Sequence, residues 1–399
     1  MSFMIKQYSL LRESRLPRVF SVSFPDPAVL DGVREDAAVG MVACAASSAN
    51  TAVRNDFDAI PIFQRPLVNA TWDAASGRWT DIVEQGEEGF TLTPTLPYRE
   101  VLYRCRPFWY RMDPLGDNAV GRVSVSPAPL VGYTLAPMFP NGKDFVYRPA
   151  FELGLGEDGL PHSRSGLMPV RANYLTLMEY ARAYDSRARV ESVKDWFSDM
   201  LLLLVEFATW NFSALMAGNK SAVTRTGYGM QGVIASSGNA TASGPCVWRG
   251  KENPWLNTRS LLCDVLMKNA NVDNKYETQI YHLPDMQYYN GVINEHYVKV
   301  GTSFPNVARG TLNVNGFSFN QGVLYPSTRV GTGQAIRSRA FIQSVNGDER
   351  MIAVGVNGSS ENGMLPVSYD ASPFFWEASQ CGQSMESKFG ARLVLDEKL

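Results

Sequence analysis

The side chains best suited to acid–base chemistry near neutral pH are three histidines, His162, His282 and His296. None of them lies in a metal-binding pattern such as H-E-x-x-H, and the sequence contains neither a G-x-S-x-G elbow nor a P-loop. Glu295 and His296 are neighbours, which in a strand would direct their side chains to opposite faces. The sequence therefore indicates no catalytic site, and we expect that the protein is not an enzyme.

Acidic side chains could supply other chemistry. Most of the clustered ones lie in glycine-rich segments typical of solvated turns: Glu84, Glu87, Glu88, Glu157 and Asp158. Glu206 differs, because it ends an apolar helical segment where an unpaired charge would be costly. For Glu206 we expect a salt bridge or hydrogen bonds to backbone in place of a catalytic role.

Metal ligands and thiols follow no recognised spacing. One stretch is rich in oxygen ligands but lacks the pattern of a calcium-binding loop: Asp264, Asn269, Asn271, Asp273, Asn274 and Asp285. We expect no cofactor, with calcium left open as an alternative. The five cysteines form no C-x-x-C pair, which favours buried free thiols over disulfides or zinc: Cys44, Cys105, Cys246, Cys263 and Cys381.

Composition narrows the class of protein. The 399 residues are 45% hydrophobic and 19% charged, with 33 Gly and 23 Pro, which is typical of a globular chain and favours β structure. With 37 Lys and Arg against 39 Asp and Glu, the chain lacks the basic excess that nucleic-acid binding requires. Its longest apolar run, 200–205, is too short to span a bilayer, and its first residues do not resemble a secretory signal. We expect neither nucleic acid nor membrane insertion, and synthesis in a cytoplasm.

Local patterns divide the chain near residue 145, after a Pro/Asn/Gly-rich turn. Residues 1–145 contain short alternating stretches, such as 101–106 and 121–126, and we expect a small β-rich region. Beyond the turn, apolar spacing predicts a helix over 170–184 through Leu175, Met178 and Ala181.

A second helix is predicted from Ser192 to about Trp210. Ser192 and Asp195 form the Ser-x-x-Asp pattern that caps a helix start, and apolar residues cover more than one face, so this helix should be mostly enclosed. From about residue 217 the sequence is rich in Gly, Asn and Ser with brief apolar runs such as 351–356. We expect short strands there, joined by long loops.

Residues 248–257, Trp-Arg-Gly-Lys-Glu-Asn-Pro-Trp-Leu-Asn, form a segment dense in aromatic and hydrogen-bonding side chains. We expect a rigid internal loop in which Trp248 and Trp255 are packed and Glu252 and Asn253 bond backbone groups. The segment resembles the R-G-x-E-N-P-W-G-N motif of phage virion proteins with a C-type-lectin-like domain, related to ligand-binding proteins that some retroelements diversify. Leu256 stands where that family usually has Gly.

Further segments resemble the same family in the same order: 56–63, 106–111, 147–151, 203–211 and 390–393. Arg148 occupies a position where the family commonly has His. The resemblance implies that one set of residues builds the scaffold: Glu206, Asn211, Trp248, Arg249, Glu252, Asn253, Trp255 and Asn257.

The resemblance implies an α+β fold. Residues 146–399 would form a C-type-lectin-like ligand-binding domain with two helices, a small mixed sheet and long loops. Residues 1–145 would form a β-rich region for virion attachment or oligomerisation. The formylglycine-generating enzymes share a related fold and use a cysteine pair, but Cys381 is alone within 118 residues, which argues against that activity.

The function implied is that of a bacteriophage virion protein, in a tail or fibre, which binds a bacterial surface glycan or protein without covalent chemistry. A homotrimer is the favoured assembly, formed in the host cytoplasm and located in the virion. The alternative is an architectural virion protein whose loops bind other virion proteins.

Ligand contacts are expected from aromatic and amide side chains in the loops after residue 257: Tyr288, Tyr289, Asn290, Asn362, Tyr369, Phe374, Phe375 and Trp376. For Phe374, Phe375 and Trp376 the competing interpretation is packing in the core or in a subunit interface, because three consecutive aromatic residues do not all face solvent cheaply.

Overall fold

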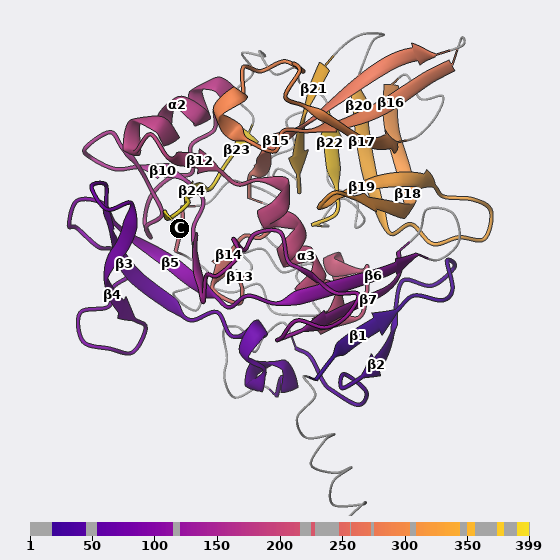
Figure 1. Cartoon of the computed structure of the whole chain (residues 1–399), viewed down its shortest axis with the longest axis horizontal. Helices are drawn as coiled ribbons and strands as arrows, with labels where there is room; N and C mark the ends of the chain where they lie inside the picture. The colour runs from indigo at the N-terminus through magenta and orange to yellow at the C-terminus, as the bar shows by residue number, and fades with distance from the viewer. Residues whose placement is uncertain are drawn as a thin grey trace, which may run out of the picture.

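The structure is a computed structural model of the chain. It describes residues 18–44, 54–114, 120–215, 225–227, 247–255, 257–272, 275–303, 309–343, 349–355, 373–378 and 389–398. Helix α3 (Val193–Phe207) lies in the middle of the molecule, with strands β1 and β7 against one side and β15 and β19 against another (Figure 1). The sheets are therefore arranged around one buried helix.

Two helices longer than one turn lie in the described residues, at the positions that the sequence predicts. Helix α2 (Tyr174–Tyr184) buries Tyr174, Leu177, Met178 and Ala181, whereas Leu175, which was expected on the apolar face, is exposed. The shorter helices are α4 (Phe212–Leu215) and three 3-10 turns, η2 (Asp56–Ala59), η3 (Pro61–Phe63) and η4 (Met286–Tyr288).

Helix α3 begins with the predicted capping box. The hydroxyl of Ser192 accepts a hydrogen bond from the N–H of Asp195, and the carboxylate of Asp195 accepts one from the N–H of Ser192. The helix ends at Ala208, whose φ of 52° is left-handed. Every residue of α3 except Lys194 is buried, which confirms the prediction of an enclosed helix.

The amino-terminal region forms a five-stranded antiparallel sheet in the order β2-β1-β7-β6-β8. Strand β7 contains the predicted alternating stretch 121–126, with Val123 and Val125 buried against α3. The strands are β1 (Phe20–Ser23), β2 (Val33–Asp36), β6 (Trp109–Pro114), β7 (Val120–Ser126) and β8 (Thr134–Leu135).

A four-stranded antiparallel sheet in the order β4-β3-β5-β9 crosses the expected division at residue 145. Its strands are β3 (Leu67–Asp73), β4 (Arg78–Glu84), β5 (Arg99–Cys105) and β9 (Val146–Pro149). Residues from both sides of 145 also pack in one core cluster around α3. Three small antiparallel pairs complete this part: β10 (Gly154–Leu155) with β11 (Pro161–His162), β12 (Ala188–Val190) with β24 (Leu393–Leu395), and β13 (Val247–Trp248) with β14 (Lys251–Glu252).

The largest sheet comes from the carboxyl-terminal part. Its order is β17-β16-β15-β21-β22-β20-β18-β19, with β23 paired to β15. The end strands β17 and β19 lie side by side (Figure 1), and near them the Nδ2 of Asn320 donates to the carbonyl of Val300 at 2.7 Å, so the sheet curls toward a barrel. The strands are β15 (Arg259–Val272), β16 (Lys275–His282), β17 (Val298–Ser303), β18 (Arg309–Asn320), β19 (Val323–Arg329), β20 (Ser338–Gln343), β21 (Glu349–Val354), β22 (Trp376–Ala378) and β23 (Phe389–Gly390).

The predicted α+β fold with a C-type-lectin-like domain is wrong. Strand accounts for 41% and helix for 13% of the residues that the structure describes, and several antiparallel sheets occur where one small mixed sheet was expected. The short strands expected after residue 217 are also a wrong prediction, because β15 spans 14 residues and β18 spans 12. Asn and Ser weaken the local strand signal of these segments, but pairing with neighbouring strands satisfies their backbone groups and overrides that preference.

Helix α3 carries a row of buried acids along one side. Asp195, Asp199 and Glu206 lie within about 40° of one another around the helix axis, at 100° per residue. Asp199 contacts the Nη2 of Arg65 at 2.7 Å and the Nζ of Lys251 at 2.9 Å. The cations that pair with these acids come from segments far away in the sequence. Their ion pairs hold the surrounding elements against the central helix.

Glu206 confirms the prediction of a structural salt bridge. It is fully buried, and its carboxylate accepts from the Nε and Nη2 of Arg249, each at 2.7 Å. The Nε1 of Trp248 donates at 2.9 Å and the Nδ2 of Asn55 at 2.8 Å. Burial opposes ionisation of Glu206, but the charge of Arg249 and these hydrogen bonds outweigh it and lower its pKa.

The hairpin β13–β14 brings the cations of the 248–257 segment to α3. Arg249 has a φ of 46° and Gly250 a φ of 80°, both left-handed, which makes the turn tight. A Cβ on Gly250 would lie 2.9 Å from the carbonyl oxygen of Arg65, so the position requires glycine. The turn thus delivers Arg249 to Glu206 and Lys251 to Asp199 from one short segment.

We predict that Glu206→Gln lowers the free energy of unfolding by about 3 kcal/mol, because it removes the buried counter-charge of the Arg249 guanidinium and leaves it only the exposed Asp58. Guanidinium chloride unfolding at pH 7 measures the loss. The exposed Glu157→Gln is the matched control and should change stability by less than about 0.5 kcal/mol. Equal stability of the two variants would contradict a structural role for the pair.

Candidate functional site

The terminal aromatic residues predicted to bind a ligand, Phe374, Phe375 and Trp376, are buried. The ring centroid of Phe374 lies 4.6 Å from that of Trp210, and Trp376 lies 6.0 Å from Trp196 of α3. Enclosed rings present no face to a ligand, which corrects their role from ligand binding to core packing. Two further predicted residues lie outside the described residues: Asn362 and Tyr369.

The predicted loop 288–290 is divided between core and surface. Tyr288 is exposed and stacks on His296, with centroids 3.6 Å apart and planes 14° apart. Tyr289 is buried against Tyr174, which corrects its predicted contact with a ligand. Asn290 is exposed, and its Oδ1 accepts from the N–H of Val292, so it also stiffens the loop. Tyr288 and Asn290 are the predicted residues that remain accessible.

The 248–257 segment packs internally as predicted. Trp248 and Trp255 are buried, and the carboxylate of Glu252 accepts from the N–H of Gly227 at 2.8 Å. The side chain of Asn253 does not follow the prediction, because it is buried without a hydrogen-bond partner among the described residues. Its main-chain carbonyl accepts instead from the Nη2 of Arg392 at 2.8 Å.

The remaining scaffold positions also make internal hydrogen bonds. The Nδ2 of Asn257 donates to the carboxylate of Glu152, which also accepts from the N–H of Thr258 at 3.1 Å. The backbone N–H of Asn211 donates to the hydroxyl of Thr209 at 3.0 Å. The contacts with Glu152 join the end of the 248–257 segment to the chain around residue 152.

Each histidine contacts a carboxylate. The pairs are His162 with Glu100 and Asp158, His282 with Asp264, and His296 with Glu295. His162 is buried, with its Nδ1 2.7 Å from Glu100 and its Nε2 3.1 Å from Asp158. Burial lowers the pKa of His162, but the contacts with Glu100 and Asp158 raise it by more, so the pKa of His162 is raised overall. Glu295 and His296 lie in a turn, so the alternation of side chains along a strand does not apply to them.

Two of the candidate oxygen ligands accept hydrogen bonds from within the protein. Asp264 accepts from the N–H of Val193 at 2.6 Å, and Asn269 accepts from the hydroxyl of Thr278 at 2.8 Å. Among the described residues, no three His, Cys, Asp or Glu side chains gather where they could hold a metal ion. Asp273, Asn274 and the side chain of Asn271 lie outside the described residues.

Two cysteines are buried free thiols, as predicted for the set. Cys105 and Cys263 are buried, and the Sγ of Cys263 donates to the carbonyl of Val190 at 3.2 Å. Burial raises the pKa of Cys105 to about 11. Cys44 is half-buried, whereas Cys246 and Cys381 lie outside the described residues.

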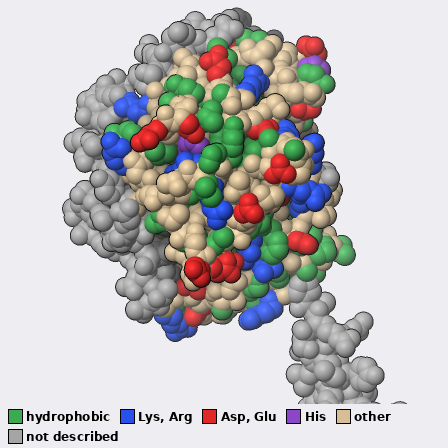
Figure 2. Space-filling model, turned by 90° about the vertical axis from the view of Figure 1, so that its left-hand side faces the viewer, with side chains coloured by type: hydrophobic (Ala, Val, Ile, Leu, Met, Phe, Trp, Pro, Cys, Tyr) green, Lys and Arg blue, Asp and Glu red, His purple; other side chains and the backbone are tan. Residues whose placement is uncertain are grey.

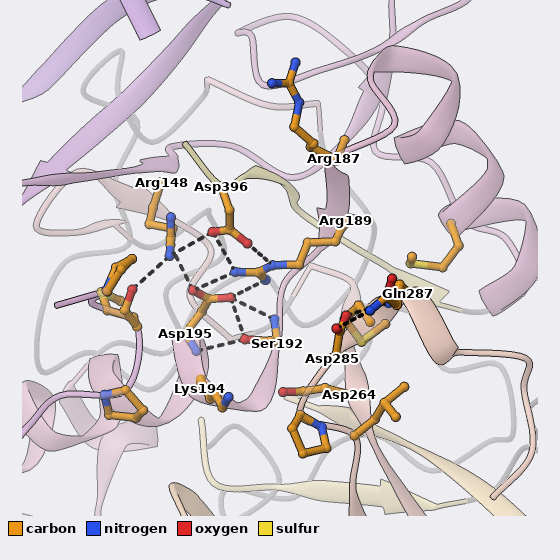
Figure 3. Close-up of a pocket in the computed structure, with 18 of the residues that line it drawn as sticks. Arg148, Arg187, Arg189, Ser192, Lys194, Asp195, Asp264, Asp285, Gln287 and Asp396 are labelled. Carbon is orange, nitrogen blue, oxygen red and sulfur yellow. Dashed lines mark hydrogen bonds and ion pairs between the residues drawn. The ribbon is translucent and has the colours of Figure 1, made fainter. Parts of the chain in front are cut away.

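A pocket of about 620 Å³ opens where α2, β12, the first turn of α3 and the turn η4 meet (Figure 3). Three of its lining residues, Asp285, Met286 and Gln287, directly precede the exposed Tyr288. Apolar side chains form one part of the wall: Pro137, Met138, Phe139, Pro140, Met178, Ala188, Leu283, Pro284 and Met286. Polar and charged side chains form the rest: Arg148, Arg182, Ser186, Arg187, Arg189, Ser192, Lys194, Asp195, Asp264, Asp285, Gln287 and Asp396.

Four of these charged side chains form a closed ring (Figure 3). Asp195 contacts the Nε of Arg148 at 2.9 Å and the Nη1 of Arg189 at 2.6 Å. Asp396 contacts the Nε of Arg189 at 2.6 Å and the Nη2 of Arg148 at 3.5 Å. The ring joins β9, β12, α3 and the segment after β24, and its two cations balance its two anions. It gives the pocket a stiff polar wall.

The sequence offers little warning of this site. It marks Asp195 only as a helix cap and Arg148 only as a departure from a family motif. Arg189 and Asp396 are 207 residues apart, so only the pairing of β12 with β24 brings them together. The chemistry available is hydrogen bonding and ion pairing from fixed groups beside apolar surface, which suits binding of a polar ligand.

The surface around this part of the molecule is mixed. On the face seen in Figure 2, Lys and Arg side chains are interspersed with Asp, Glu and apolar side chains, so that face offers no continuous basic surface. No helix in the described residues is long and apolar enough to cross a membrane.

We predict that Asp195 makes stability sensitive to acid. Burial opposes its ionisation, but Arg189 and Arg148 outweigh burial and hold the pKa of Asp195 well below the value of about 3.9 that is ordinary for an aspartate. The unfolded chain therefore takes up this proton at a higher pH than the folded chain does, and the stabilisation present above about pH 5 is lost progressively as the pH falls below about 4 toward the lowered pKa of the folded state.

Urea unfolding between pH 7 and pH 3 measures this effect. The loss of stability with falling pH should be shallower in Asp195→Asn than in the wild type. The exposed Asp144→Asn should keep the wild-type slope. Parallel slopes for the wild type and Asp195→Asn would refute the assignment.

No protein-family model matches the sequence, and no curated protein matches it. These comparisons lend no support to the resemblance of the 248–257 segment to phage virion proteins.

Proposed function

We propose that this protein is a structural component of a bacteriophage virion, in a tail or fibre, and that it binds a glycan on the bacterial surface without covalent chemistry. The observation that carries the binding proposal is the pocket of about 620 Å³ with its fixed charged ring, next to an exposed aromatic stack. The virion setting comes from the resemblance of segments such as 203–211 and 248–257.

A glycan suits this pocket better than a flat protein surface does. Concave sites of several hundred cubic ångströms enclose small or extended ligands, whereas protein partners usually cover broad surfaces. Sugars present hydroxyl groups on an otherwise apolar ring. Gln287, Ser186 and Asp285 offer donors and acceptors for the hydroxyls, and Phe139 and the prolines offer apolar surface for the ring.

Tyr288 extends the site beyond the pocket. Its ring stacks on His296, and its carbonyl accepts from the Nδ2 of Asn294 at 3.0 Å, so the loop is held in place. An aromatic face fixed in this way packs on a sugar at little entropic cost. Display of several copies, in the trimer expected for this setting, would raise a weak single-site affinity through effective concentration.

We predict that Tyr288→Ala weakens binding to bacterial cells by about 3- to 10-fold, the range expected for loss of one aromatic contact. Fluorescently labelled protein is titrated onto a panel of bacterial strains that includes the phage host. Tyr98→Ala, another exposed tyrosine, is the control and should bind as the wild type does. If the protein binds saturably and Tyr288→Ala binds equally well, η4 is not part of the binding site. If the wild type binds to none of the strains, receptor recognition is refuted.

A second candidate function is the architectural one, and exposed apolar residues favour it. Val29, Val33, Val39 and Val42 are exposed around β2, an edge strand of the five-stranded sheet. Edge strands with apolar side chains are ready surfaces for another chain. In this role, β2 and its flanking turns would contact a neighbouring virion protein.

We predict for this role that Val33→Asp with Val39→Asp prevents incorporation into virions and leaves binding of the free protein to cells unchanged. Immunoblots of purified particles measure incorporation. Incorporation at the wild-type level would refute an architectural contact through β2.

A further inference from the structure

Some of the charged side chains that line the pocket beside η4 have ion-pair partners within the protein, and others do not pair with any described residue. Its wall contains five basic and four acidic side chains. Arg148 and Arg189 are neutralised within the ring by Asp195 and Asp396. Arg187 makes an ion pair with Asp185, from its Nε to Oδ1 at 3.0 Å, and its Nη2 donates to the carbonyl of Ala74 at 2.6 Å. Three of the five cations therefore have partners within the protein.

The other two cations, Arg182 and Lys194, make no side-chain hydrogen bond or ion pair within the described residues. Arg182 comes from the last turn of α2, whereas Lys194 comes from the first turn of α3. Lys194 is the only residue of α3 that is not buried, so the pocket is where this enclosed helix reaches solvent. Two cations from different helices thus line one cavity.

The remaining acids do not cancel these cations. Asp264 accepts from the N–H of Val193 and faces the Nε2 of His282 at 3.3 Å. Asp285 accepts from the N–H of Gln287 at 3.0 Å and is exposed to water. Neither forms an ion pair with Arg182 or Lys194. The cavity therefore combines two cations that make no ion pair within the described part of the chain with acceptors suited to hydroxyl groups.

We infer that the ligand of this pocket is an acidic glycan, whose carboxylate or phosphate groups pair with Arg182 and Lys194. This inference rests on the proposed function and specifies the class of glycan. Guanidinium and ammonium groups bind carboxylate and phosphate through charge-assisted hydrogen bonds, which strengthen in a partly enclosed site. Ser186 and Gln287 on the same wall then serve the neutral hydroxyls of the same sugar chain.

A competing structural role exists for Arg182, since a cation in the last turn of α2 stabilises the helix dipole. That role predicts a lower melting temperature for Arg182→Gln and no change in the choice of ligand. A binding role predicts the opposite pattern. Melting curves recorded for every variant therefore separate the two.

The experiment uses surface polysaccharide extracted from a strain that the full-length protein binds. Affinity is measured before and after reduction of its carboxyl groups, and before and after removal of its phosphates with hydrofluoric acid. We expect one of these treatments to weaken binding at least about tenfold, and the treatment that does so identifies the acidic group.

The variants tie this preference to the two cations. Lys194→Gln and Arg182→Gln should each weaken binding of the untreated polysaccharide, by about tenfold, while the treated material binds the variants and the wild type equally. Lys299→Gln removes an exposed lysine outside the pocket and should keep the wild-type preference.

Equal binding of treated and untreated polysaccharide would overturn the acidic-glycan inference and leave glycan binding intact. A preference for untreated polysaccharide that survives in the variant carrying both Arg182→Gln and Lys194→Gln would overturn the assignment to these two cations. Absence of binding to any strain would refute the proposed function itself, and the inference with it.

Discussion

The structure depends on compensation of the acids buried along helix α3. Asp195, Asp199 and Glu206 stand on one side of a helix that is enclosed almost throughout, where an ion without a partner would cost several kcal/mol. Each acid is matched by cations from distant segments, among them Arg65 and Arg249. Because these cations come from separate sheets and loops, neutralising the helix also fixes the places of the elements around it.

This constraint explains why the 248–257 segment is dense in special residues. Its turn must deliver Trp248, Arg249 and Lys251 to two carboxylates of α3, and left-handed backbone at Arg249 and Gly250 makes that reach possible. The same constraint shapes the pocket, since Asp195, the first acid of the row, is also a member of the Arg–Asp ring. The scaffold and the candidate site therefore share one set of ion pairs.

The division of aromatic residues between core and surface decides where a ligand can bind. The predicted aromatic run at 374–376 fills space between α3 and the largest sheet, where the ring of Phe374 contacts Trp196 of α3 and Phe317 of β18. Tyr288 remains outside, beside a cavity lined by charged groups, of which Arg182 and Lys194 make no side-chain hydrogen bond or ion pair with the other residues that the structure describes. The recognition site that we propose would rely on fixed polar groups and one aromatic face, and less on a broad hydrophobic patch.

The sequence by itself determined the features that neighbouring residues control. The capping box at Ser192 and Asp195, the enclosed helix that follows it, the strands around 101 and 121, and the salt-bridged state of Glu206 all follow from spacing or from the cost of a lone buried charge. The nine-stranded sheet, the burial of Phe374 and the pairing of Arg189 with Asp396 were decided only by the tertiary structure. In each of these features, the stabilising contacts join residues that lie tens to hundreds of positions apart in the sequence. A local sequence pattern does not indicate which distant residue will be the partner.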